Sequence, residues 1–112
     1  MEDTNNMLSV LDEYLQSSPS DIAKQISQDF RHRRVEKGLT REQMAEQSGV
    51  AVSNIVRFEQ KGLISLTNLI ALAHVLGYSA EIKNLFATPK YSTMEELTQI
   101  RKNAGKTKAY RK

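Results

Sequence analysis

Five side chains between residues 52 and 60 carry groups that can contact the edges of base pairs. The guanidinium of Arg57 can donate two hydrogen bonds to guanine, and the hydroxyl of Ser53 can bond several bases. The amides of Asn54 and Gln60 can reach adenine or the DNA backbone, and Val52 can pack on a thymine methyl group. At helical spacing, these residues predict a polar helix face suited to the major groove of DNA.

The sequence gives no indication of catalysis or of metal binding. Cysteine is absent, which excludes disulfides, thiolate zinc sites and cysteine nucleophiles. The two histidines, His32 and His74, fall on different predicted helices without supporting motifs, and His74 is expected to be a packed or half-exposed imidazole. No glycine-rich phosphate loop follows a strand, because no clear strand exists. We therefore expect no enzyme activity, no cofactor and no metal.

A first short helix is predicted at the start of the stretch 40–62. Thr40 and Gln43 have the spacing of a capping box, in which each side chain bonds the other's backbone N–H. Leu39 and Met44 have the spacing of a hydrophobic staple, which fixes the direction in which the chain enters the helix. The small side chain of Ala45 lets a second helix cross closely.

A sharp turn and a second helix follow. Gly49 can adopt the left-handed conformation that ends the first helix, and Val50 fills the corner. The second helix is expected from about Val52 to Gln60. One of its sides is expected to face the protein, and this side carries Ala51, Ile55, Phe58 and Glu59.

This arrangement resembles the Xre or lambda-repressor-like helix-turn-helix family of phage and bacterial regulators. The resemblance covers roughly residues 20–77 and rests on Leu39-Thr40, Ala45, Gly49-Val50, Ile55, Phe58-Glu59 and Gly62. It implies an all-α fold: a compact five-helix domain, extended here by an N-terminal helix and by a C-terminal helix with a basic tail. It also implies a structural ion pair between Arg34 and Glu59, and a contact of Arg41 with the DNA backbone.

Ala51 departs from the family pattern, which has Ser or Thr at this position as the cap of the second helix. Alanine cannot cap, and the loss costs about 1 kcal/mol. Ser53 could cap instead, which would move the start of the helix by two residues.

Three regions are expected: an N-terminal amphipathic segment (1–19), the helix-turn-helix domain (20–88), and a C-terminal helix with a basic tail (89–112). The first contains a predicted helix over 4–16, followed by a hinge at 17–20. Its apolar face must be buried on its own domain, on a symmetry mate or on a partner, and it consists of Met7, Leu8, Leu11, Tyr14 and Leu15.

The helix that follows is expected to be capped by Ser20 or Asp21 and to end at Gly38. Its predicted inner face consists of Ile22, Ile26 and Phe30. In the basic run near its end, Arg31 and Arg33 are candidates for phosphate contact, with solvated surface as the alternative.

Two further helices are predicted before the tail. One is capped by Ser65, ends at Gly77 and is expected to be mostly buried, because it is apolar over much of its circumference. The next is short and capped by Ser79, with an apolar side of Ile82, Leu85 and Phe86; in the resembled family the corresponding region often makes the homodimer contact. Pro89 ends it.

A capping box at 92–95 opens a last helix, whose apolar residues are Met94, Leu97 and Ile100. The tail 101–112 holds six cations and no acid, and is expected to be disordered when free. It could contact DNA phosphates or a partner, or serve only solubility.

Charge is distributed unevenly. The net charge is +3, but residues 1–23 hold five acids and no Lys or Arg, so the rest of the chain carries +8. A basic body suits nucleic-acid binding better than the total suggests. No apolar run reaches membrane-spanning length and the acidic start is unlike a signal peptide, so we expect a cytoplasmic, nucleoid-associated protein and no membrane.

These features predict a transcription regulator that binds double-stranded DNA. One domain contacts only a few base pairs, so specificity favours a homodimer on an inverted-repeat operator, with half-sites about 34–36 Å apart.

The chain also resembles HipB-type antitoxins, which bind operator DNA and a HipA-like kinase toxin. This likeness rests on the bare single domain and on an end that contains Leu85-Phe86, Pro89-Lys90-Tyr91-Ser92 and Glu96-Leu97 before a basic tail. The alternatives are a stand-alone phage-type or housekeeping regulator and a monomeric module that bridges transcription factors. The bridging module would bind DNA weakly and without sequence preference.

Overall fold

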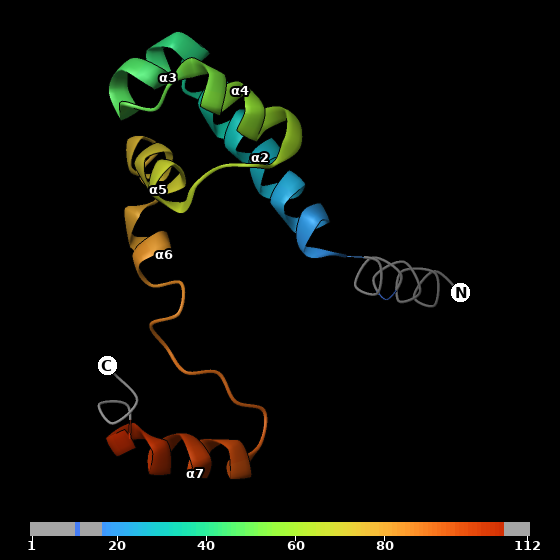
Figure 1. Cartoon of the computed structure of the whole chain (residues 1–112), viewed down its shortest axis with the longest axis vertical. Coiled ribbons are helices and arrows are strands. Elements are labelled where there is room, and N and C mark those ends of the chain that lie inside the picture. The colour runs from blue at the N-terminus through green and yellow to red at the C-terminus, as the bar shows by residue number, and fades with distance from the viewer. Residues whose placement is uncertain (1–10, 12–16, 107–112) are drawn as a thin grey trace. The chain divides into compact units, whose positions relative to one another are not determined.

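The computed structural model describes residue 11 and residues 17–106, and the regular elements in these ranges are all helical (Figure 1). They are α2 (Pro19–Glu36), α3 (Arg41–Ser48), α4 (Val52–Lys61), α5 (Leu66–Val75), α6 (Ser79–Lys83) and α7 (Met94–Asn103), followed by the 3-10 turn η1 (Ala104–Lys106). The predicted all-α fold is confirmed. The predicted helix over 4–16 lies outside the described residues, except for Leu11. None of the helices described is long and apolar enough to cross a membrane.

The start of α2 differs from the prediction. Ser18 is the N-cap, and its hydroxyl accepts a bond from the backbone N–H of Asp21, while the Asp21 carboxylate accepts from the N–H of Ser18. These two hydrogen bonds lower the pKa of Asp21. Pro19 has no N–H to lose and a fixed φ that suits a first helical turn, so it begins the helix. The predicted cap at Ser20 or Asp21, and the hinge over 17–20, were therefore wrong.

The predicted caps of α3 are confirmed. Thr40 and Gln43 form the reciprocal capping box, with bonds of 3.0 and 2.9 Å. Gly49 ends α3 in the left-handed conformation at φ 77°, which a residue with a side chain adopts only at a cost. Helix α4 begins directly after Ala51, which makes no side-chain cap bond. The alternative start at Ser53 was therefore wrong.

Helix α4 is held by its apolar side. It packs against α2 and α3, and α5 packs against α3. The rings of Phe30 on α2 and Phe58 on α4 are 5.3 Å apart and inclined at 53°, a favourable tilted pair. The core that holds these helices together consists of Phe30, Met44, Val50, Ile55, Phe58, Leu72 and Leu76.

Two predicted buried faces are only partly buried. On α2, Phe30 lies in the core, but Ile22 and Ile26 are 52% and 46% exposed, because the buried side of this helix runs through Ser27, Phe30 and Arg34. On α5, which was expected to be mostly buried, Leu66 is 66% and Ile70 42% exposed.

Residues 80–112 form a second unit, separate from 1–79. Helix α6 starts at Ser79 itself rather than after it as a cap, and turns over 84–87 follow it, so this helix ends before Pro89. The N-cap of α7 is Thr93, and the carboxylate of Glu96 accepts from the N–H of Ser92, so the predicted capping box is displaced by one residue. Residues 101–106 are helical, so disorder was wrongly predicted there.

Candidate nucleic-acid interface

Helix α4 presents the predicted base-contacting residues on its solvent side. Ser53, Asn54, Arg57 and Gln60 are exposed, and Val52 is half-buried. On the opposite side, Ile55 and Phe58 are fully buried. Because the buried side chains fix the rotation of the helix, the polar side is presented to solvent as a rigid surface of donors and acceptors.

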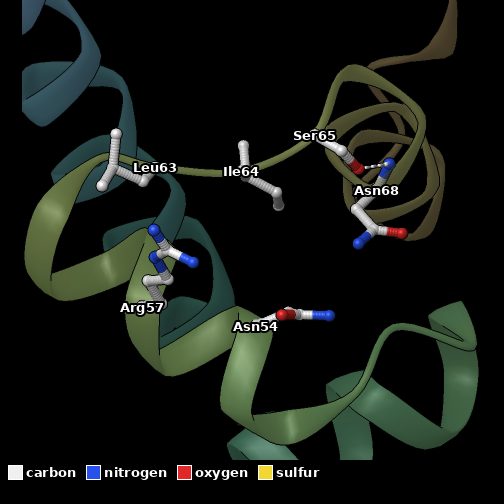
Figure 2. Close-up of a pocket in the computed structure, with 6 residues that line it drawn as sticks. All are labelled: Asn54, Arg57, Leu63, Ile64, Ser65 and Asn68. Carbon is white, nitrogen blue, oxygen red and sulfur yellow. Dashed lines mark hydrogen bonds between the residues drawn. The ribbon is translucent and has the colours of Figure 1, made fainter.

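Asn54 and Arg57 also line a groove of about 410 Å³ between α4 and the start of α5. The opposite wall is formed by the connection between the two helices and by α5, and consists of Leu63, Ile64, Ser65 and Asn68. Figure 2 shows Asn54 and Asn68 facing each other across the groove, with Arg57 beneath the connection. Two amides and a guanidinium therefore converge on one open space.

The groove residues on α5 were not predicted as functional from the sequence. Ser65 caps α5 by accepting a bond of 3.2 Å from the backbone N–H of Asn68, which the sequence predicted, and this cap places Asn68 in the first turn. The signal that could have identified Asn68 is its position, because the first turn of a helix points its free N–H groups outward.

A buried carboxylate joins three helices beside this surface. Glu59 of α4 has a side chain only 1% exposed, and its two oxygens accept bonds of 2.7 and 3.1 Å from the guanidinium of Arg34 on α2. Arg34 also donates a 2.7 Å bond to the backbone oxygen of Leu39, just before α3. The expected pair between Arg34 and Glu59 is thus present, with the fork geometry that makes such pairs strong.

Arg41 contacts the same carboxylate. Its Nε lies 3.1 Å from Glu59 Oε1, a second ion pair that the sequence did not indicate. The Arg41 side chain is 34% exposed, and a guanidinium carries further N–H donors on its two terminal nitrogens. Glu59 therefore orients Arg41 at the first residue of α3, where a helix N-terminus also favours an anion.

The remaining basic candidates on α2 differ from each other. Arg33 lies 3.4 Å from Glu36, and both side chains are well exposed, so part of its charge is neutralised locally. Arg31 is exposed, with no ion pair printed by the geometry of the described residues. Of the two, Arg31 is the better placed to meet a phosphate.

The histidine on α5 has a structural partner. His74 is exposed, and its Nδ1 lies 2.7 Å from the hydroxyl of Ser79. Over residues 17–106 no three His, Asp or Glu side chains are placed to hold a metal ion.

Residues 30–83 match the family model described as helix-turn-helix. The matched segment runs from the second half of α2 to α6 and contains α3, α4 and the groove. No curated protein and no solved structure matches the chain.

Proposed function

Residues 30–83 belong to the helix-turn-helix family, so the chain is a DNA-binding transcription regulator, and from this premise we propose that it is a sequence-specific repressor that binds an inverted-repeat operator as a homodimer. The observation that supports this most is the division of α4 into a buried apolar side and an exposed polar side. A surface built only to be soluble does not require the helix to be held so rigidly.

In this proposal α4 lies in the major groove. Arg57 donates to O6 and N7 of a guanine, Ser53 bonds a neighbouring base edge, and Val52 packs on a thymine methyl group. Asn54 and Gln60 bond adenine or the sugar–phosphate backbone.

The backbone contacts set the position of α4. Arg41, oriented by the buried Glu59, meets a phosphate at the N-terminus of α3, and Arg31 meets another. These contacts carry little sequence information, but their release of counterions makes the affinity strongly dependent on salt.

The proposal is tested by selection from a pool of random DNA duplexes with the full chain. The expected result is an inverted repeat whose half-sites are centred one helical turn apart. With Arg57→Ala, the selected motif should lose its preference at one position in each half-site, while Arg101→Ala on α7, an exposed arginine outside the α4 surface, should select the wild-type motif. Failure to enrich any motif would contradict the proposal and favour the bridging module.

A finer proposal is that the protein is the antitoxin of a toxin–antitoxin operon with a HipA-like kinase. The second unit favours it, since apolar side chains that a stand-alone DNA-binding domain does not need are exposed there: Leu85, Phe86, Tyr91 and Met94. Co-expression with a kinase encoded by the neighbouring reading frame should give a stable complex and suppress phosphotransfer. Absence of such a frame, or of a complex, would leave the stand-alone regulator.

A further inference from the structure

Helix α5 presents an uncharged apolar surface to solvent. Leu66 and Ile70 lie one turn apart on the same side of the helix and are exposed, and Leu63 in the preceding connection is exposed as well. We call these three residues the α5 face. Between Lys61 and Glu81 the sequence has no Asp, Glu, Lys or Arg, although 26% of the chain is charged. An exposed helix without charges is the composition of an interface core.

The α5 face is not an unused part of the domain core. The other side of α5 already supplies buried Leu72 and Ala73, and Leu69 and Val75 pack against the same core. The helix is therefore fully anchored without Leu66 and Ile70, whose burial requires something outside residues 17–79. This explains why the sequence pattern predicted a mostly buried helix.

We propose that a second copy of this chain covers the α5 face, so that two α5 helices pack against each other across a two-fold axis. In such an isologous contact each surface meets itself. A face without formal charge can do so without repulsion, whereas the chain beyond residue 23 carries a net +8 and its charged surfaces repel their own copies.

The position of the α5 face supports this occupant. Leu63 belongs both to the face and to the groove, and Ser65 and Asn68 of the same helix face Asn54 across that groove (Figure 2). The dimer contact is thus continuous with the surface proposed to meet DNA. Resting on the proposed function, the two-fold axis at α5 would place both α4 helices toward one side of a duplex, as an inverted repeat requires.

Because the chain has no cysteine, a single introduced thiol can test the contact directly. Ile70→Cys in the full-length protein should form a disulfide-linked dimer under mild oxidation, since bridged residues have Cα atoms about 4.4–6.8 Å apart. Val35→Cys on α2, which is similarly exposed, is the matched control and should stay monomeric on a denaturing gel.

Sedimentation equilibrium of the full chain without DNA gives an independent measurement. Leu66→Glu should weaken dimerisation at least about tenfold, because two carboxylates would face each other in a dry contact, with the helical circular dichroism unchanged. Val35→Glu should leave the dimer intact. A monomeric wild type, or a dimer that Leu66→Glu does not weaken and Ile70→Cys does not cross-link, would overturn the inference and indicate that residues 1–16 or 80–112 cover the face.

The outcomes separate this inference from the proposed function. A cross-linked dimer that selects no DNA sequence would uphold the α5 contact and refute the repressor. A monomer that selects a single half-site would do the reverse.

Discussion

Replacing Glu59 with alanine is the change expected to destabilise this domain most for the number of atoms removed. The mutation leaves the Arg34 guanidinium, only 8% exposed, without a counter-charge between α2 and α4. Removing one partner of a buried ion pair costs roughly 3–5 kcal/mol. A small domain has about 5–15 kcal/mol of stability in total, so a large part of the variant could unfold at room temperature.

The structure also ranks the partners of Glu59. Arg34→Ala should cost nearly as much as Glu59→Ala, because Arg34 supplies both bonds of the fork and a third bond to Leu39 O. Arg41→Ala should cost at most about 1 kcal/mol, because its single bond lies beside solvent and its charge is partly screened.

The assay is urea unfolding followed by circular dichroism, with the free energy of unfolding extrapolated to water. Glu36→Ala is the control, since Glu36 forms an exposed pair with Arg33 that is worth at most about 1 kcal/mol. The double variant Arg34→Met with Glu59→Leu should be more stable than either single alanine variant, because no buried charge is left unpaired. Equal costs for Glu59→Ala and Glu36→Ala would refute the reasoning.

Three further predictions concern the helix ends. Ala51→Ser should stabilise the protein by about 1 kcal/mol, because α4 has no side-chain cap; an unchanged urea midpoint would contradict this. Gly62→Ala should cost more than the control Gly49→Ala: both glycines have positive φ, but only at Gly62 would the new Cβ lie 3.0 Å from backbone, that of Ala23, and equal urea midpoints would show that the contact relaxes freely. Asp21→Asn should lower the thermal midpoint at neutral pH, and the difference from wild type should shrink as pH falls below about 3.9, because the pKa of Asp21 is lowered by folding and its contribution is lost once it is protonated. A difference independent of pH would exclude the capping carboxylate as its source.

Local chemistry made the helix-turn-helix predictable. A capping box, a left-handed glycine and an apolar side at helical spacing each act within one or two turns, and α3 and α4 begin and end where these signals place them. The start of α2 was missed for a local reason as well, since a proline that breaks a helix interior is favourable in its first turn.

Burial was less predictable, because it depends on which partners are present. The apolar residues of α2 and α5 have the spacing of inner faces, but α3 and α4 cover only one side of α2, and Ile22, Leu66 and Ile70 extend beyond the core. The second ion pair of Glu59 was missed for a related reason: Arg41 and Glu59 are distant in sequence, and only the crossing of α3 and α4 brings them together.

The central claim is that the exposed polar side of α4 distinguishes one DNA sequence from another. The most direct measurement is the ratio of affinities for the selected operator and for a scrambled duplex at one fixed salt concentration, in wild type and in Arg57→Ala. The account predicts that this ratio falls about 5- to 150-fold, equivalent to roughly 1–3 kcal/mol for one bidentate contact, while affinity for the scrambled duplex changes much less. A ratio that stays the same in Arg57→Ala would contradict it.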